Sequence, residues 1–288
     1  MKEKLLDPKV DFVFKRIFGS EKHPNILISF LNSVLGTKGT KKEIVKVKID
    51  NAEINREWEE DKLSRLDVKA TADDGRKLNV EIQLKNQYNM KRRTLYYWSK
   101  LYTSQLNKGE KYSQLRKTVA INILNFNYLK SMEDYHNCFL LKEKENNQVL
   151  TDIEEIHFIE LTKLNEEKYQ DLKKINDDLI PWLLFLKDPE SEVVKMIEEK
   201  VEELKEAAEN LEIMSQDKEE RQKYEARQKA IHDYLTNLEG AKQEGVKLGE
   251  RGRNIEIAKE MIEDGEELEK IMKYSKLSKE EIKGLQKS

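Results

Sequence analysis

The sequence of 288 residues predicts an α/β fold in which a mixed β-sheet is flanked by helices and followed by a long helical C-terminal extension. The first observation is that helical and strand patterns interleave as far as Asn165, without the regular alternation of βαβ units. The second is that strand patterns stop there. The third is composition, because 38% of residues are hydrophobic and 38% are charged, so much of the chain must be solvated helix surface.

The N-terminal region predicts two helices. Residues 5–19 carry helix signals at both ends, with Asp7 as the N-cap, Pro8 at the first helical position and Gly19 past the end. The second helix is predicted from Pro24 to Leu35 and is closed by Gly36. Residues 44–49 then alternate as a strand, with one face formed by Val45, Val47 and Ile49.

Later segments supply the rest of the predicted sheet and its cover. Residues 89–107 predict a helix, in which apolar and aromatic residues recur with Gln105 at helical spacing: Leu95, Trp98, Leu101 and Tyr102. Residues 118–126 are almost continuously aliphatic, which suits a strand buried on both faces. Residues 137–142 and 153–161 predict two more strands, and residues 180–186 predict an apolar helix docked on the core.

Between residues 65 and 85, apolar and polar residues alternate along two arms, which predicts a β-hairpin. Asp73, Asp74 and Gly75 supply the turn, where glycine is free to take positive φ. One face is apolar: Leu66, Val68, Ala70, Leu78, Val80, Ile82 and Leu84. The other face is polar: Asp67 and Lys69 from the first arm, and Glu81, Gln83 and Lys85 from the second.

The polar face of this hairpin is the candidate site. Asp67 paired across the sheet with Glu81 offers hard oxygen ligands on a stiff frame, which suits a divalent ion such as Mg²⁺. A metal-bound water would attack a phosphodiester, Gln83 would orient that water, and Lys85 would contribute positive charge. The alternative interpretation is a solvated hairpin face, on which the same residues form cross-strand salt bridges.

The helix that follows the hairpin opens with three cations, Lys91, Arg92 and Arg93. They are interleaved with aromatic residues: Tyr96, Tyr97, Trp98 and Tyr102. Cations beside aromatic rings suit phosphate contacts and base stacking, so the three are candidate nucleic-acid contacts. The alternative interpretation is a solvated helix start whose aromatic residues belong to the core.

Beyond Pro189 the chain is charge-rich, with Glu and Lys at separations of three and four, which predicts solvated helix. A series of four glycines predicts a weak helix or a hinge: Gly240, Gly245, Gly249 and Gly252. The last segment splits at Gly265, and Ser278 opens a final helix as a capping box would. We therefore expect two domains, residues 1–213 and residues 214–288.

Composition narrows the class of protein. With 53 Lys+Arg against 56 Asp+Glu the net charge is -3, so any basic surface must be local. No apolar run approaches the roughly 18–20 residues of a membrane span, and a signal-peptide segment is not evident, so a cytoplasmic protein without a membrane partner is expected. Cys138 is the single cysteine, which argues against a disulfide or a cysteine-based zinc site. The histidines lack ligand spacing and are interpreted as surface or core residues: His23, His136, His157 and His232.

A family resemblance favours the metal site over its alternative. Asp67, followed fourteen residues later by Glu81-Ile82-Gln83, resembles the PD-(D/E)XK nuclease signature, with glutamine in place of the usual lysine. The flanking segments DPKVDFVFKRIFG, FLNSVLG, LDVKATADDGRKLNVEIQ and RRTLYYWSKLYTSQLNKGEKYSQL resemble Rpn-type recombination-promoting nucleases, also described as PD-(D/E)XK family transposases. The likeness is specific over residues 5–126, looser to about residue 186, and compositional in the tail.

The resemblance implies a restriction-endonuclease-like fold in which Asp67 and Glu81 bind the metal and Gln83 takes the lysine's place. Mg²⁺ is the expected cofactor, with Mn²⁺ or Ca²⁺ as substitutes in vitro. Asp11 matches the family's aspartate before Phe-Lys and either completes the site or braces it. Because glutamine lacks the positive charge of lysine, either Lys85 or a second metal compensates, or the activity is weak.

Three functions are left open by the sequence. The leading hypothesis is a Mg²⁺-dependent DNA endonuclease acting in recombination, mobile-element movement or defence. The second is a nuclease-like fold that has lost catalysis and serves as a binding or assembly module, forming a homo-oligomer through its helical tail. The third is an RNA substrate, because metal-dependent phosphodiester cleavage does not itself select the sugar.

Overall fold

The computed structural model describes residues 4–50, 68–86, 89–169 and 175–286. The chain divides into two compact units, residues 1–225 and residues 226–288, and each is described separately below. Among the helices of the described residues, none is long and apolar enough to cross a membrane.

The first unit is built on a six-stranded mixed sheet, in the order β1-β2-β3-β4-β6-β5. The strands are β1 (Val47–Ile49), β2 (Val68–Ala72), β3 (Lys77–Gln83), β4 (Thr118–Leu124), β5 (His136–Phe139) and β6 (Glu154–Glu160). The central pairs β3–β4 and β4–β6 are parallel, and the outer pairs are antiparallel. All seven residues of β4 are buried, as its continuous aliphatic run predicted.

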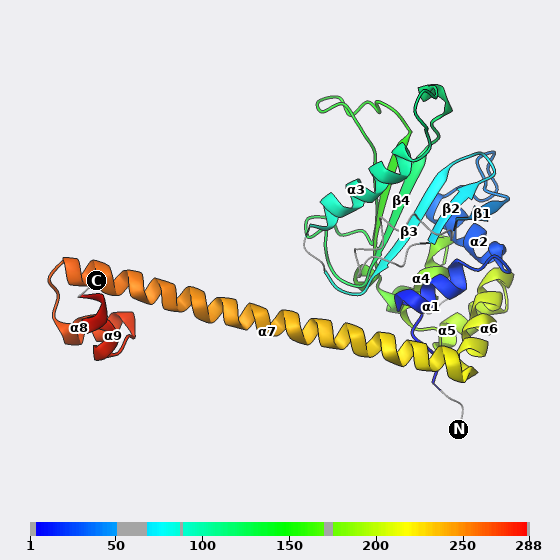
Figure 1. The fold of residues 1–288 in the computed structure, drawn as a ribbon. Coiled ribbons are helices and arrows are strands. Elements are labelled where there is room, and N and C mark those ends of the chain that lie inside the picture. The colour runs from blue at the N-terminus through cyan, green and yellow to red at the C-terminus, as the bar shows by residue number, and fades with distance from the viewer. Residues whose placement is uncertain (1–3, 51–67, 87–88, 170–174, 287–288) are drawn as a thin grey trace. The chain divides into compact units, whose positions relative to one another are not determined.

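Helices cover both faces of this sheet (Figure 1). They are α1 (Asp11–Phe18), α2 (Pro24–Leu35), α3 (Met90–Thr103), α4 (Leu179–Lys187), α5 (Glu192–Glu198) and α6 (Glu202–Gln216), with 3₁₀ turns η2 (Tyr112–Gln114), η3 (Leu161–Lys163) and η4 (Glu166–Tyr169). The main core joins one face of the sheet to α1, α2, α4, α5 and α6. A smaller core lies on the other face, which α3 covers. The predicted α/β class with a mixed sheet is therefore confirmed.

An aromatic cluster anchors the main core. The ring of Phe18 lies 5.2 Å from that of Phe30 and 5.5 Å from that of Trp182, measured between centroids in edge-on geometry. Each ring comes from a different helix, and all three are fully buried. The helix predicted over residues 180–186 is thus α4, and it docks on the core as expected.

The predicted hairpin is present as β2 and β3, joined by a turn in which Gly75 has φ 88°. In its register Val68 lies opposite Val80, so the apolar residues of β2 and β3 face the main core. One part of the prediction is wrong, because β3 ends at Gln83 and Lys85 lies in an exposed bend beyond it. The alternation of side chains therefore stops before Lys85.

The first helix begins later than predicted. The N-cap of α1 is Val10 rather than Asp7. Asp7 instead forms a turn of its own, since its carboxylate accepts the backbone N–H of Lys9 at 2.9 Å and its carbonyl accepts that of Val10 at 3.0 Å. Asp7, the predicted N-cap, therefore belongs to the turn that precedes α1. By contrast, α2 has the predicted bounds, and Gly36 closes it in the left-handed conformation with φ 61°.

The strand predicted over residues 44–49 is mostly irregular. Only Val47–Ile49 pair with β2, and Val45 is 63% exposed. The reason is Asn32 of α2, whose amide group holds the backbone of Ile44 from both sides: Nδ2 donates to its carbonyl and Oδ1 accepts its N–H, each at 2.8 Å. A side chain therefore replaces the strand partner that Ile44 would otherwise need.

The helix predicted over residues 89–107 is α3, but its buried side differs from the prediction. Leu95 is 48% exposed, whereas the buried residues of α3 are Met90 and Thr94. Trp98 donates its indole N–H to the Thr118 carbonyl at 2.9 Å, and Gln105 Nε2 donates to Thr118 Oγ1 at 3.0 Å. Polar contacts to β4 from Trp98 in α3 and from Gln105 just after it therefore help to hold this segment on the sheet.

Two helices from the charge-rich region belong to the core, which corrects the prediction of solvated helix there. Both α5 and α6 present an apolar stripe that is fully buried in the main core: Val194, Ile197, Leu204, Ala207 and Leu211. Ser215 near the end of α6 is buried as well, and its Oγ accepts the N–H of Leu6 at 2.9 Å. High charge content on the outer face concealed an ordinary amphipathic pattern.

Helix α7 (Lys218–Glu263) begins in the first unit and continues into the second, so the four glycines lie within a helix. The chain then turns at Gly265, with φ 72°, into α8 (Leu268–Ser275) and α9 (Lys279–Leu285). Their small core consists of Ala258, Ile271, Leu277 and Ile282. The predicted capping box is confirmed, because Ser278 and Glu281 each bind the backbone N–H of the other.

Candidate metal centre on the β3 strand

Strand β3 places its polar residues on the sheet face that α3 covers. Leu78, Val80 and Ile82 point to the main core, so Asn79 and Glu81 lie on the opposite face. Both are buried, with 5% and 2% of their surface exposed. The predicted polar face of the hairpin is thus covered on β3, and the interpretation of a solvated face is wrong for Glu81.

Glu81 is a buried carboxylate with few partners. Its Oε1 lies 3.4 Å from Asn79 Nδ2, and its Oε2 lies 3.9 Å from Arg93 Nε. In the part of the chain that the structure describes, neither Glu81 Oε2 nor Asn79 Oδ1 has a hydrogen-bond partner. Buried oxygens are normally satisfied, so two adjacent unsatisfied ones mark a place where a cation would fit.

The Arg93 side chain lies beside Glu81 and is mostly shielded from solvent. Its side chain is only 17% exposed, and its guanidinium lies 5.5 Å from the Tyr97 ring centroid as well as near Glu81. Lys91 and Arg92, by contrast, are exposed. Of the three predicted nucleic-acid contacts, Arg93 therefore faces the carboxylate, and the other two remain available to a ligand.

Asn122 of β4 lies directly beside Glu81 in the parallel pairing of β3 and β4. Its Oδ1 accepts a hydrogen bond from Thr94 Oγ1 and its Nδ2 donates to the His157 carbonyl, both at 3.0 Å. It therefore ties α3, β4 and β6 together next to the candidate ligand. The sequence did not identify Asn79, Thr94 or Asn122 as part of the site. For Asn122 a signal was present, because it is a polar residue inside the aliphatic run of residues 118–126.

The other predicted site residues are spread over several places. Gln83 ends β3 and is half-buried, and its carbonyl accepts the N–H of Asn125 at 2.9 Å. Asp11 is the first residue of α1, half-buried, and its Oδ1 accepts the N–H of Phe12 at 2.6 Å. Lys85 is exposed beyond the strand. Asp67 lies outside the described residues, directly before Val68 in the chain.

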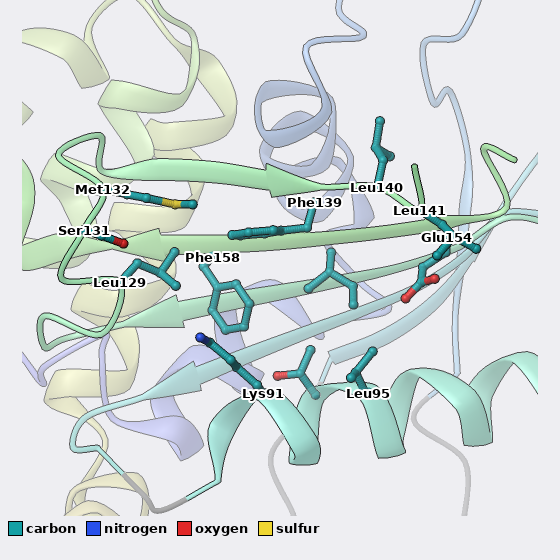
Figure 2. Close-up of a pocket in the computed structure, with 12 residues that line it drawn as sticks. Lys91, Leu95, Leu129, Ser131, Met132, Phe139, Leu140, Leu141, Glu154 and Phe158 are labelled. Atoms are coloured by element: carbon teal, nitrogen blue, oxygen red, sulfur yellow. The ribbon is translucent and has the colours of Figure 1, made fainter. Parts of the chain in front are cut away.

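A pocket of about 320 Å³ opens on the same side of the sheet, between α3 and the strands β5 and β6. Figure 2 shows the Lys91 side chain running from α3 toward Phe158 and Leu129, with Glu154 at the opposite end. The rest of the lining is mainly apolar. Burial raises the pKa of the Glu154 carboxyl above its ordinary value. The pocket thus combines an apolar floor with one cation from the basic start of α3.

Comparison with protein families gives a match over most of the chain. A family model described as PD-(D/E)XK nuclease family transposase matches residues 8–241. This range contains the whole β-sheet, both candidate ligands Asp67 and Glu81, and the basic start of α3. Neither the curated proteins nor the solved structures include a match to the chain.

Proposed function

Because the chain belongs to the PD-(D/E)XK nuclease family of transposases, we propose that it is a Mg²⁺-dependent endonuclease that hydrolyses phosphodiester bonds in DNA. Membership itself points to a nuclease-type function on DNA, and nucleases of this family typically use a divalent metal ion. The observation that supports the finer proposal most is the buried Glu81 carboxylate, whose Oε2 has no hydrogen-bond partner in the described chain.

The proposed ligands are Glu81 and Asp67. The hairpin register supports the pair, since Val68 follows Asp67, Val80 precedes Glu81, and Val68 lies opposite Val80. Asn79 Oδ1 is a candidate third oxygen, which suits the preference of Mg²⁺ for oxygen ligands. When bound there, the ion would lower the pKa of a coordinated water and neutralise charge on the phosphate.

The remaining residues would position these groups. Arg93, 3.9 Å from Glu81 Oε2, would hold the carboxylate in place while the metal is absent. Gln83 at the end of β3 would orient the attacking water, and Asp11 would complete or brace the site. Lys85 and the exposed Lys91 and Arg92 would supply positive charge to the DNA backbone.

Cleavage of supercoiled plasmid DNA in the presence of Mg²⁺ tests the proposal. The purified chain should nick or linearise the plasmid, and both Asp67→Ala and Glu81→Ala should lower the rate by at least a hundredfold, the order expected when charge stabilisation is removed. Glu192→Ala is the matched control, because that carboxylate is 87% exposed on α5. Equal cleavage by all four proteins would refute the assignment. An RNA competitor in the same assay decides between the two sugars.

The alternative function is an assembly module with a catalytically silent nuclease fold. The observation that favours it is α7, whose middle part leaves large apolar side chains exposed: Tyr234, Leu238, Val246 and Leu248. Helices of this kind commonly pair with other helices. Light scattering would give a multiple of the monomer mass for the full chain and the monomer mass after deletion of residues 226–288; a monomer in both would remove this function.

Recombination, mobile-element movement or defence is the proposed setting for the activity, because the matching family model describes transposases. Cutting DNA is the chemical step that all three processes share. A recombination assay in cells would compare the wild-type chain with Glu81→Ala at equal expression. An equal frequency of recombinants with the wild type and with Glu81→Ala would contradict this biological role. The nuclease activity itself would still be tested by the cleavage assay.

A further inference from the structure

A second cluster of ligand-type side chains lies at the other edge of the sheet, on strands β5 and β6. The antiparallel register puts Cys138 directly opposite His157, and Glu155 precedes His157 by two residues on the same face. This is not the face that carries Glu81, because Glu81 aligns through Asn122 with Phe158, the neighbour of His157. The cluster is therefore separate from the candidate nuclease site.

The three side chains converge on one point. Nε2 of His157 lies 2.8 Å from Glu155 Oε1 and 3.9 Å from Cys138 Sγ, and one ligand atom from each residue falls within 4.8 Å of the others. Donor atoms of a tetrahedral zinc site with ordinary bond lengths stand roughly 3.3–3.6 Å apart. The two distances from His157 lie within about half an ångström of this range, and the third, between Cys138 and Glu155, is at most 4.8 Å, so the side chains need to close by up to about one ångström to hold such an ion.

A second layer of contacts already orients these groups. His136 Nε2 lies 2.8 Å from the other ring nitrogen of His157, the kind of contact that fixes the ring of a metal-binding histidine. Lys117 pairs with Glu155 through Oε2, which leaves Oε1 turned toward His157. His157 itself is buried, whereas Cys138 is exposed and provides a path for an ion from solvent.

We propose that Cys138, Glu155 and His157 form a binding site for Zn²⁺ or a transition-metal ion of similar softness. A sulfur, a nitrogen and an oxygen ligand together select such an ion over Mg²⁺, which prefers oxygen alone. Three protein ligands leave the fourth position to water. The ion ties the short edge strand β5 to β6 and stabilises that edge of the sheet. Nothing in this site depends on the proposed nuclease activity.

Co²⁺ is the probe for this site, because it replaces Zn²⁺ and its bond to a thiolate absorbs strongly in the near ultraviolet. The chain has one cysteine, so such a band reports on Cys138 alone. Metal-free full-length protein titrated with Co²⁺ should develop the band at one equivalent. One equivalent of Zn²⁺ should remove it, and a large excess of Mg²⁺ should not.

Variants complete the test. Cys138→Ser, an exposed and near-isosteric change, should abolish the band, and His136→Gln should weaken Co²⁺ binding tenfold to a hundredfold as loss of an orienting contact does. His23→Gln, outside the cluster, and Glu81→Ala should bind as the wild type does. Absence of the band in the wild-type protein, its persistence in Cys138→Ser, or its loss in folded Glu81→Ala would each overturn the proposal.

Discussion

At the scale of single residues, Glu81 sets the character of the candidate site. It is almost fully buried, and the cation nearest to it in the described chain is Arg93, at a distance longer than a hydrogen bond. Its Oε2 also has no hydrogen-bond partner in the described chain. A buried carboxylate with an unused oxygen favours a bound cation, and it lowers the stability of the fold when no cation is present.

Metal binding at Glu81 should therefore raise the free energy of unfolding. At a Mg²⁺ concentration about a hundred times its Kd, the free energy of unfolding of the wild type should rise by about 2.7 kcal/mol. Glu81→Gln should lose this gain, since a neutral amide binds Mg²⁺ poorly, whereas Glu192→Gln should keep it. Chemical denaturation with and without Mg²⁺ measures all three, and an equal gain in Glu81→Gln would place the metal elsewhere.

In the proposed site, Gln83 takes the place of the lysine of the PD-(D/E)XK signature. Gln83→Lys would bring a cation to the end of β3, where the strand is half-buried and the positive charge is not strongly screened. We expect plasmid cleavage to become about tenfold faster, which corresponds to about 1.4 kcal/mol of transition-state stabilisation. Gln83→Met, similar in size and uncharged, is the control; equal rates for both variants would assign no role to charge here.

At the scale of elements, caps and turns decide where helices and strands end. The predicted bounds of α2 are confirmed because two local signals, Pro24 and Gly36, mark its ends. Those of α1 are wrong at the start because Asp7 serves a turn instead. Side-chain contacts from elsewhere ended the regular structure of residues 44–49, and no local pattern announces such a contact.

The left-handed conformation of Gly36 can be tested directly. Its φ is 61°, and apart from Gly36 and its two chain neighbours no atom lies within 4 Å of the position that a Cβ would take, so the cost of substitution comes from the backbone conformation. Gly36→Ala should lower the free energy of unfolding by about 1–2 kcal/mol. Gly36→Asn should cost less, because asparagine tolerates this conformation. Denaturant titration compares the two, and an equal loss would contradict the conformational explanation.

The capping box of α9 should respond to pH. Hydrogen bonds from the backbone N–H and hydroxyl of Ser278 lower the pKa of Glu281 below its ordinary value of 4.5. A carboxyl group with a lowered pKa stabilises the fold above pH 4.5, and this contribution disappears as the pH falls through its folded-state pKa. A carboxyl-carbon NMR titration should give a Glu281 midpoint below 4.5. Ser278→Ala removes only the hydroxyl bond and should move the midpoint part of the way toward 4.5; an unchanged midpoint would mean that the hydroxyl does not lower this pKa.

At the scale of the whole molecule, the first unit extends further along the chain than its charge pattern suggested. Helices α5 and α6 complete the core, and the start of α7 is bound to the N-terminal segment. Arg221 donates to the Lys4 carbonyl at 2.9 Å, and the N–H of Leu6 donates to Ser215 at 2.9 Å. The nuclease-like fold thus uses residues from both ends of its unit.

Truncation distinguishes the predicted domain boundary from the boundary of the compact unit. Removal of residues 226–288 should leave the unfolding of the first unit unchanged. Removal of residues 214–288 should lower its free energy of unfolding by about 1–3 kcal/mol, because at least two hydrogen bonds to the N-terminal segment are lost. Denaturation followed by Trp fluorescence reports on the core through Trp182. Equal stability of the two truncated chains would support residues 1–213 as the domain.

Local patterns in the sequence determined most of the elements of this protein, including the hairpin, and they indicated Glu81 as a candidate metal ligand. Period-two and helical spacings act between near neighbours, so a single sequence displays them. Only the tertiary structure decided that Asn79, Asn122 and Arg93 surround Glu81, and that Cys138 meets His157. These contacts join residues far apart in the chain through strand register and the packing of α3, and burial, which converts a polar face into a site, follows from the whole fold.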